Sequence, residues 1–381
     1  MFKNQNALLE DFAKALDVSE HHFDLAVARY KSLGVWLGRE ESKVVNFSPN
    51  VYSQGSFRLG TVIKPISDDE DYDLDIVVEV DLSKQQITQK DLKELIGQEV
   101  VTYAEAHQMN NVPKDRQRCW TLEYAEEARF HMDVLPSIPD SAGFRLLLES
   151  NRSQSNYWNS AIAITDNKWS NYSQVSFEWP RSNPNGYAEW FKARTELPRH
   201  IAMFSESRGI SIDEVPEFRV KTPLQRAVQL LKHHRDILFL KNPAIKPISM
   251  VITTLAALAY KGEPDIITTL RNVTTRMEQH ITYTGNRLSI KNPVDPLEDF
   301  ADRWSEDDAK YFFFWLQKAK GLFGGFAEFS EGQALNEILK ESFGEGLTKR
   351  VMGQSSIVSC HQKTNFPPKV IIQSPPRQWR R

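Results

Sequence analysis

Hydrophobic residues recur every three or four positions in the first forty residues of the chain and again in its second half. Near the start the spacing runs from Phe23 through Tyr30 to Leu37, which is the period of an amphipathic helix. Asp17, three positions before Glu20, has the form of a capping box at the beginning of that helix. In the second half the same period predicts helices over residues 223–240, 248–260, 263–281, 305–324 and 332–343.

A different pattern marks short strands between these helical regions. Residues 75–80 (DIVVEV) are rich in β-branched side chains, and residues 119–124 and 129–135 alternate polar and apolar positions like paired strands. A helical period returns over residues 88–107. Residues 136–222 are rich in Pro, Ser, Asn and Trp, so we expect them to wrap over the sheet and to supply binding loops.

The two patterns together predict an α+β (α/β) fold, in which a small mixed sheet is followed by a C-terminal helical lobe. We assign residues 1–215, with the N-terminal helices and the sheet, to a first lobe, and residues 216–354 to the helical lobe. Residues 355–381 form a basic, proline-rich tail that we expect to be extended, because its composition cannot bury enough apolar surface to fold alone.

The composition is that of an ordinary globular protein, with 40% hydrophobic and 25% charged residues. A formal net charge of -3 argues against a protein whose whole surface wraps nucleic acid. The two cysteines, Cys119 and Cys360, stand far apart, so neither a disulfide framework nor a cysteine zinc site is indicated. The N-terminus does not have the form of a signal peptide, and no apolar run is long enough for a membrane span. We therefore expect a soluble cytoplasmic protein with no membrane partner.

Acidic residues crowd one stretch directly before a predicted strand. Six of the eight residues from 68 to 75 are aspartate or glutamate. Neighbouring carboxylates repel one another, and burying one of them without a partner is costly. The acids from Asp68 to Asp71 fit a solvated loop, but Asp73 and Asp75 lie inside the apolar run and need another explanation.

Asp73 and Asp75 share one face of the predicted strand because side chains alternate across a sheet, while Leu74 between them faces the core. Their carboxylates can converge on one or two cations, and hard oxygen ligands suit Mg²⁺ or Mn²⁺. A third carboxylate is available from Asp133, on the polar face of the strand RFHMDVL. We therefore predict a two-metal site formed by Asp73, Asp75 and Asp133.

Gly55 and Ser56 precede these acids, and a glycine followed by a hydroxyl can form a nest whose amides cradle a phosphate if the pair opens a helix. Simpler interpretations remain open on the residues alone. Asp73 and Asp75 fit a loop-to-strand cap, His131 fits a hydrogen-bonded structural residue, and Arg58 fits either a phosphate contact or a surface position on a helix. The ordered set of GS, a D-apolar-D strand and a later strand aspartate favours a site for metal and nucleotide.

The sequence motifs around these residues narrow the class of protein further. They are QGSFRLGTVIKP, YDLDIVV, FHMDVLPSIPD, NPNGYAEWF and KTPLQRAVQLLKHHRDI. Over residues 50–260 the chain resembles the bacterial CD-NTases, relatives of cyclic GMP-AMP synthase and oligoadenylate synthase within the polymerase-β-type nucleotidyltransferases. The resemblance implies a polymerase-β-like catalytic lobe at residues 1–215 and a helical lobe like that of oligoadenylate synthase, with the active site in the cleft between them.

The resemblance also implies a role for each predicted site residue. Gly55 and Ser56 would hold the donor triphosphate. Asp73 and Asp75 would bind two magnesium ions, and Asp133 would bind the ion that activates the acceptor hydroxyl. These three aspartates would be the catalytic residues.

Two residues of the second lobe are implied by the same family pattern. Lys232, on the helix after Pro223, would reach the triphosphate, and Ser249, which opens the next helix, would contact a phosphate. A solvated helix position fits Lys232 equally on the sequence alone.

The implied activity joins ribonucleoside triphosphates into a cyclic di- or trinucleotide and releases pyrophosphate, in the anti-phage signalling called CBASS. The expected partners are the triphosphates, including at least one purine (ATP, GTP or both), an effector reached through the diffusible product, and regulators encoded in the same operon. Direct activation by DNA is not expected, because the sequence lacks the histidine and cysteine cluster of the animal enzyme's zinc element. If the activity is as implied, we expect removal of the tail after residue 362 to leave catalysis within a few-fold of that of the full chain.

Two other functions stay open. The same aspartates would serve a template-independent transferase that extends RNA or nucleotidylates a protein, and a chain without turnover could act as a nucleotide or RNA sensor. For the bases, we expect stacking on aromatic side chains of the loop region. The candidates are Tyr157, Trp158, Trp169, Tyr172, Trp179 and Trp190.

Overall fold

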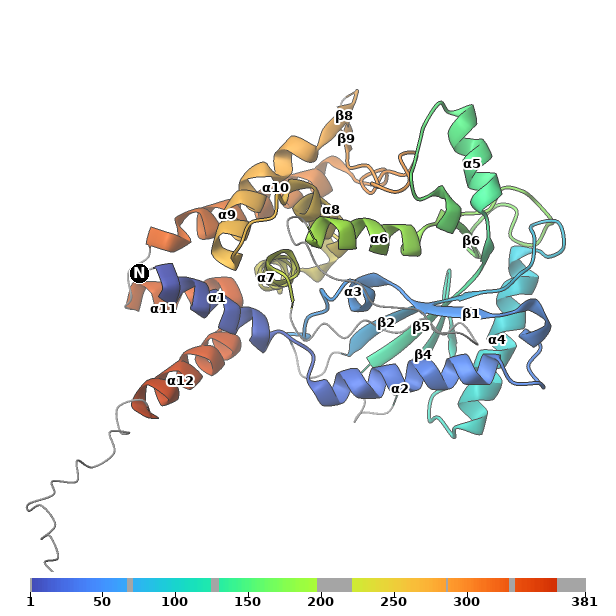
Figure 1. The fold of residues 1–381 in the computed structure, drawn as a ribbon, viewed down its shortest axis with the longest axis horizontal. Coiled ribbons are helices and arrows are strands. Elements are labelled where there is room, and N and C mark those ends of the chain that lie inside the picture. Colours follow the sequence, from blue (N-terminus) through green and yellow to red (C-terminus); the bar gives the residue numbers. More distant parts are fainter. Residues whose placement is uncertain are drawn as a thin grey trace, which may run out of the picture.

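The computed structural model describes residues 2–66, 71–124, 130–196, 221–285, 287–328 and 333–361. Its helices and strands fall into two groups, one built around a sheet and the other mainly helical (Figure 1). The mixed α+β class that the sequence predicts is confirmed. The predicted boundary at residues 215–216 lies outside the described residues and stays a prediction.

Seven described strands form one mixed sheet with the order β1-β2-β5-β4-β3, and β6 and β7 continue from β5. The strands are β1 (Asn50–Ser53), β2 (Tyr72–Glu79), β3 (Lys114–Asp115), β4 (Trp120–Glu123), β5 (Phe130–Pro139), β6 (Ile162–Ile164) and β7 (Arg181–Ser182). Strands β2 and β5 run parallel, while the neighbouring pairs are antiparallel. The antiparallel pairing of β4 with β5 confirms the predicted strand pair.

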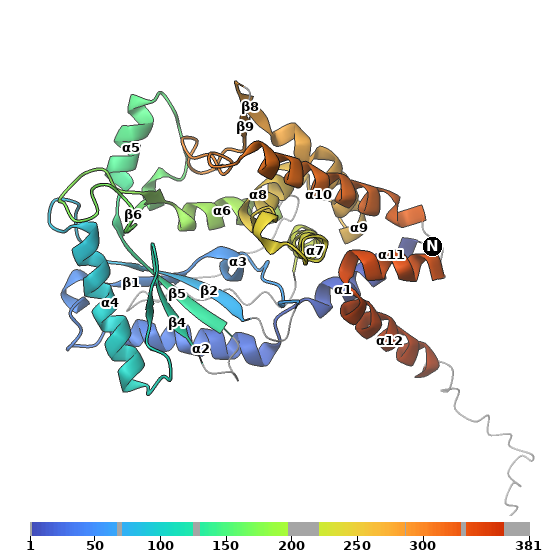
Figure 2. The ribbon, with the colours of Figure 1, turned by 180° about the vertical axis from the view of Figure 1, so that it is seen from behind.

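Two long helices cover one face of this sheet, as Figure 2 shows from behind. The helices of this lobe are α2 (Glu20–Leu37), α3 (Gly55–Arg58), α4 (Gln89–Ala106) and α5 (Ser141–Ser150). Tyr30 of α2 and Ile96 of α4 pack in one core with Ile76 and Val78 of β2. The apolar side of the central strand is therefore buried under α2 and α4, and its acidic side faces the other way.

The capping box predicted at Asp17 is wrong. The residue that caps α2 is Ser19, whose Oγ accepts a hydrogen bond from the backbone nitrogen of His22 at 3.3 Å. Ser19 stands directly before the first helical residue and can reach its free amides, whereas Asp17 lies too far upstream. Asp17 instead forms ion pairs with Lys221 and Arg226, which lie more than 200 positions later in the sequence.

The remaining helices form the second group. They are α1 (Phe2–Ala15), α6 (Pro184–Thr195), α7 (Pro223–Leu238), α8 (Ser249–Ala259), α9 (Ile266–Arg276), α10 (Glu306–Gly325), α11 (Gln333–Phe343) and α12 (Glu345–His361). Phe12 of α1 packs in one core with Leu230 of α7, Leu270 of α9 and Phe312 of α10. The first helix of the chain thus contributes to the helical core, although it precedes the sheet in sequence.

Short elements complete the chain. A separate two-stranded hairpin is formed by β8 (Thr282–Thr284) and β9 (Arg287–Ser289). The 3-10 helices are Val45–Phe47, Trp158–Ser160, Pro243–Ile245, Met277–His280 and Phe326–Glu328. In the part of the chain that the structure describes, no helix combines the length and the apolarity that a membrane crossing needs.

The tail differs from the prediction at its beginning. Residues 355–361 are not extended but continue α12, which contains no proline between Glu345 and His361. The first proline of the tail is Pro367, so nothing in the sequence breaks the helix earlier. The rest of the predicted tail, residues 362–381, lies outside the described residues.

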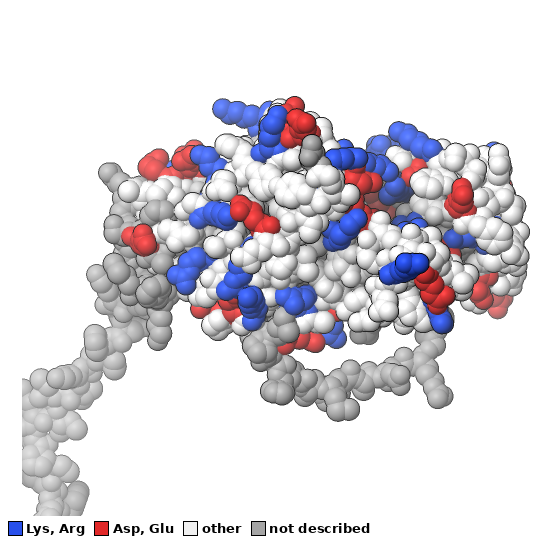
Figure 3. All heavy atoms as spheres, turned by 90° about the horizontal axis from the view of Figure 1, so that it is seen from above, with Lys and Arg blue, Asp and Glu red and all other residues white. Residues whose placement is uncertain are grey.

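Charged side chains are interspersed over the face of the molecule that Figure 3 shows, with acidic and basic groups side by side. On the described residues of that face no broad area carries a single sign. This distribution agrees with the formal net charge of -3 and offers no continuous basic track to a nucleic acid backbone there.

Candidate active site

The parallel pairing of β2 with β5 brings the predicted acids together. Asp75 lies opposite Asp133 in the register, and Asp73 lies opposite His131. Leu74 and Ile76 are buried in the core, so the aspartates face away from it. The alternation of side chains that the sequence predicts for β2 is confirmed, and the three aspartates lie on the same side of two adjacent strands.

These carboxylates are strained electrostatically. Burial, together with the negative charges of Asp73 and Asp133, raises the pKa of Asp75 to about 7. Burial and the neighbouring Asp133 also raise the pKa of Asp73 above its ordinary value. Asp133 Oδ1 accepts a hydrogen bond from the hydroxyl of Thr121 at 2.5 Å. The site therefore holds more negative charge than its own cationic side chains neutralise.

Gly55 and Ser56 open α3, as the nest interpretation requires, with Gln54 as the residue before the helix. Gly55 has a φ of +64°, and a Cβ at this position would lie 2.3 Å from Asp75 Oδ2. The backbone nitrogen of Gln54 donates to the carbonyl oxygen of Asp75 at 2.8 Å. The predicted phosphate cradle is thus attached to the carboxylate strand, and only glycine fits where the two meet.

A cavity of about 700 Å³ lies between the sheet and the helical group. Six of the seven predicted site residues line it, and these are Gly55, Ser56, Asp73, Asp75, Lys232 and Ser249. The seventh, Asp133, does not line the cavity but lies on the adjacent strand beside Asp75. The structure therefore brings together residues that are as far as 194 positions apart in the chain, counted from Gly55 to Ser249.

Lys232 is buried, and its Nζ donates a hydrogen bond to the carbonyl oxygen of Thr61 at 2.9 Å. Burial, with the nearby positive charge of Arg235, lowers its pKa to about 8. The alternative of a solvated helix position for Lys232 is wrong, because α7 is covered on this side by the segment that follows α3.

Ser249 is the first residue of α8, and its Oγ accepts a hydrogen bond from Arg235 Nη1 at 2.9 Å. Sequence reasoning missed Arg235 and Asp236, which line the cavity one helical turn after Lys232. Arg235 also donates to the carbonyl oxygen of Pro247 at 2.8 Å. The spacing of Lys232 and Asp236 along a helix predicted from its period could have pointed to Asp236, since residues four apart share a face.

The structure also locates the residues for which simpler interpretations were open. His131 Nε2 lies 3.3 Å from Asp71 Oδ2, so His131 contacts an acid of the loop before β2. Asp71, expected in a solvated loop, lines the cavity, while Asp68, Asp69 and Glu70 lie outside the described residues. Arg58 donates to the carbonyl oxygen of Ser53 at 3.1 Å, which is a structural contact within the lobe.

The aromatic residues proposed for base stacking do not line the cavity, as far as the described residues show. Trp179 and Trp190 are buried in the hydrophobic cores, and Tyr157 and Trp158 pack against them. Trp169 donates its indole hydrogen to the carbonyl oxygen of Glu178 within the same loop. The expected stacking platform is therefore not formed by these six residues. The apolar walls of the cavity come instead from other residues, which include Val62 and Ile63 after α3 and Phe239, Leu240 and Ile248 of the helical group.

The chemistry of the acidic side chains fits magnesium. Asp73, Asp75 and Asp133 are hard oxygen donors, and burial together with neighbouring negative charges raises the pKa of the first two, a cost that a bound divalent cation would relieve. Among the described residues, no three side chains of histidine, cysteine, aspartate or glutamate form a ready-made metal cluster. The three aspartates therefore have the donor atoms that Mg²⁺ prefers, but their carboxylates do not surround a common point in this structure.

A Gly-Ser turn beside paired strand aspartates, in a cavity closed by a helical lobe, is the arrangement of a nucleotidyltransferase. Residues 49–136 match the family model described as "Cyclic GMP-AMP synthase DncV-like, nucleotidyltransferase domain". The chain is 30% identical over 375 residues to the c-di-GMP synthase of Roseivirga ehrenbergii, an alignment that covers 90% of this chain and 92% of the relative. The chain therefore belongs to the DncV-like family of bacterial nucleotidyltransferases, the CD-NTases, and the predicted resemblance is confirmed.

Two further comparisons agree with this family. The cyclic dinucleotide synthase CdnG of Bradyrhizobium diazoefficiens is 24% identical over 367 residues, covering 91% of this chain and 82% of that protein. A structure of the Bradyrhizobium diazoefficiens CD-NTase CdnG in complex with GTP superimposes with a TM-score of 0.65 at 21% identity, over 91% of this chain and 97% of the other. The likeness extends through both lobes and shows that the CD-NTase fold is shared along nearly the whole chain.

Proposed function

We propose that this protein joins two molecules of GTP into a cyclic dinucleotide and releases two molecules of pyrophosphate. The observation that carries the proposal is the cavity in which Gly55 and Ser56 lie against Asp75 while Lys232 and Ser249 close the opposite wall. The choice of guanine is supported by the relative named c-di-GMP synthase and by the structure of CdnG with GTP.

Each predicted site residue has a role in this proposal. The amides and hydroxyl at Gly55 and Ser56 bind the donor triphosphate, and Lys232 and Ser249 contact its phosphates from the helical lobe. Asp133, on the strand beside Asp75, would act on the side of the acceptor ribose. The protein would accelerate the reaction mainly by holding the acceptor hydroxyl in line with the α-phosphate and by screening charge.

Two magnesium ions, with manganese as a substitute, complete the proposed site. Asp73 and Asp75 would hold both ions, and Asp133 would hold the ion nearer the acceptor. When bound, such ions lower the pKa of an attacking hydroxyl and neutralise the charge of the leaving pyrophosphate. The repulsion among the carboxylates supports this part of the proposal, since it disfavours the site without cations.

The product would act as a diffusible signal. We propose that it reaches a separate effector in anti-phage defence, that the protein works in the cytoplasm where nucleoside triphosphates are available, and that regulators encoded in the same operon set its activity.

The experiment that tests the proposal uses the purified chain with four labelled ribonucleoside triphosphates and magnesium or manganese. The products are treated with phosphatase and identified by mass. We expect a phosphatase-resistant product with the mass of cyclic di-GMP, and none from the Asp73→Asn, Asp75→Asn double variant. Products that keep a phosphatase-sensitive end, or labelled protein, would favour a template-independent transferase. Absence of any turnover by the unmodified chain would favour a sensor.

A further inference from the structure

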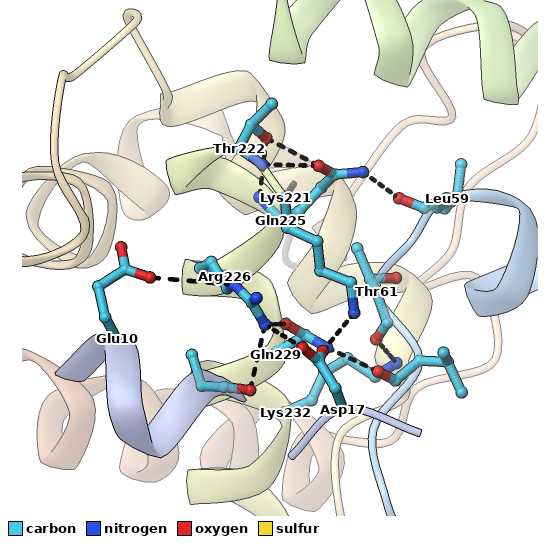
Figure 4. A network of polar contacts seen from close by, with 12 residues as sticks. Glu10, Asp17, Leu59, Thr61, Lys221, Thr222, Gln225, Arg226, Gln229 and Lys232 are labelled. Atoms are coloured by element: carbon cyan, nitrogen blue, oxygen red, sulfur yellow. Dashed lines mark hydrogen bonds and ion pairs between the residues drawn. The ribbon is translucent and has the colours of Figure 1, made fainter. Parts of the chain in front are cut away.

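Three polar side chains on one face of α7 hold the backbone that follows the phosphate cradle, residues 59–62 (Figure 4). Their spacing of four and then three residues places them on a single helical stripe. The hydrogen bonds run from Gln225 Nε2 to the Leu59 carbonyl (2.9 Å), from Gln229 Nε2 to the Val62 carbonyl (2.8 Å) and from Lys232 Nζ to the Thr61 carbonyl (2.9 Å). A helix of the second group thereby determines the path of a segment of the first.

That segment is tied directly to the cradle. The backbone nitrogen of Leu59 donates to the Gly55 carbonyl at 3.2 Å, and that of Thr61 donates to the Ser56 carbonyl at 2.9 Å. Leu59 and Thr61 also line the cavity. A displacement of residues 59–62 would therefore move the amides and the hydroxyl that face the donor phosphates.

The two glutamines are buried among apolar neighbours. Gln225 is 3% exposed and Gln229 is 0% exposed, while Leu224 and Val228 beside them belong to the helical core. A buried glutamine amide adds little to folding stability, compared with a leucine of similar size, even when its hydrogen bonds are made. It lowers folding stability when they are not made. The polar groups at these positions are thus matched to the carbonyls that they meet.

Asp17 fixes the orientation of Gln229. Its Oδ1 accepts from Gln229 Nε2 at 2.9 Å and from Lys221, and its Oδ2 accepts from Arg226 Nη1 at 2.7 Å. Arg226 also donates to Gln229 Oε1 at 3.2 Å. The amide nitrogen of Gln229 donates to a carboxylate and a carbonyl, and its oxygen accepts from a guanidinium. A flipped amide would lose all three hydrogen bonds, so only one orientation satisfies the group.

We propose that Gln225 and Gln229 are positioning residues for nucleotide transfer, which set the place of the Gly55–Ser56 cradle relative to Asp75 and the donor triphosphate, and that Asp17 orients Gln229 for this task. The inference rests on the nucleotide synthesis proposed above. It assigns a role in substrate positioning to side chains that do not line the cavity.

The test compares Gln229→Met with Thr222→Ala in the full-length protein. Methionine keeps the length of glutamine but removes both hydrogen bonds that it donates. Thr222→Ala removes the cap of the same helix, where Thr222 Oγ1 accepts from the Gln225 nitrogen and donates to Gln225 Oε1, but it keeps the Nε2 donors of Gln225 and Gln229 that meet the carbonyls. We expect Gln229→Met to lower kcat/KM for GTP at least tenfold, mainly through KM, and Thr222→Ala to lower Tm without that loss.

A double-mutant cycle with Ser56→Ala separates positioning from general damage. If Gln229 acts through the cradle, Gln229→Met should cost clearly less in the Ser56→Ala background than in the unmodified protein. Wild-type kcat/KM in Gln229→Met, or losses that multiply fully with those of Ser56→Ala, would overturn the inference.

A second variant covers a failure of Gln229→Met to fold. Gln225→Met keeps the length of the side chain, adds no buried charge and removes the donor to Leu59. It should show the same rise in KM, and an unchanged KM would count against the inference. If the unmodified protein makes no cyclic product, the proposed function fails instead, so the two failures are distinguishable.

Discussion

Substituting Gly55 by alanine tests whether the contact between the cradle and the carboxylate strand is needed for catalysis. Gly55 and Gly285 have nearly the same positive φ, +64° and +62°. An alanine in the left-handed region costs about 1–2 kcal/mol. At Gly285, in the turn between β8 and β9, an added Cβ would meet nothing within 4 Å, whereas at Gly55 it would lie 2.3 Å from Asp75 Oδ2. Gly285→Ala is therefore the matched control for backbone strain.

The clash at Gly55 should affect activity more than stability. The atom that the Cβ meets is the far end of an aspartate side chain, which can rotate away at a cost of about 1 kcal/mol. We expect both variants to melt a few degrees below the unmodified protein, by roughly 2–4 °C per kcal/mol. The displacement of the Asp75 carboxylate should lower the rate strongly, because a shift of about 1 Å at a reacting centre can cost about a hundredfold in rate.

The assay measures thermal melting and the initial rate of pyrophosphate release from GTP for both variants. We expect Gly55→Ala to lose about a hundredfold or more in rate, and Gly285→Ala to stay at the wild-type rate with a similar loss of Tm. A wild-type rate in Gly55→Ala would show that Asp75 need not occupy its observed place. An equal loss of rate in Gly285→Ala would show that strain alone explains the effect.

Three further predictions follow from the described contacts. Asp73→Asn with Asp75→Asn should abolish turnover without lowering Tm, because neutral amides are less costly to bury than carboxylates and take two negative charges away from Asp133; circular dichroism and product analysis check this. Lys232→Met should weaken GTP binding about ten- to hundredfold, the value of one lost contact to a charged group, as measured by calorimetry. Burial lowers the pKa of His234 to about 4, well below its ordinary value of about 6.5. The unfolded chain therefore takes up the proton first as pH falls, and folding stability should be full above about pH 6.5 and lose about 3 kcal/mol on the way to pH 4. Urea unfolding at several pH values should show this loss, reduced in His234→Leu.

The local patterns of the sequence predict the catalytic strand well. A period of two places Asp73 and Asp75 opposite Leu74, and the same alternation places Asp133 on the polar side of its own strand, so the parallel pairing of these strands completes the group. Helices with a clear period, such as α7 and α8, are predicted for the same reason. These features depend on neighbours within a few residues of one another.

The contacts that the sequence did not reveal are long-range. Asp17 looks like a cap in its local context, but its partners Lys221 and Arg226 are more than 200 positions away. Gln225 and Gln229 interrupt an apolar helix face, and only the fold shows that carbonyls of residues 59–62 lie opposite them. The tryptophans of the loop region look like stacking platforms by composition, whereas packing decides which of them are buried.

The helix α7 links stability and chemistry in this molecule. The positive charge of Lys232 favours the ionised form of Asp75, while burial and the two neighbouring carboxylates disfavour it more strongly. The same helix holds the cradle backbone through Gln225, Gln229 and Lys232, and its apolar residues lie at the centre of the helical core. The cleft can therefore hold the excess negative charge of its aspartates for two reasons. Lys232 supplies a positive charge, and the packing of α7 in the helical core keeps this helix in place against their repulsion. A substitution that loosens α7 in that core should consequently reduce nucleotide binding before it unfolds the sheet, since side chains of α7 hold residues 59–62, which are hydrogen-bonded to the cradle.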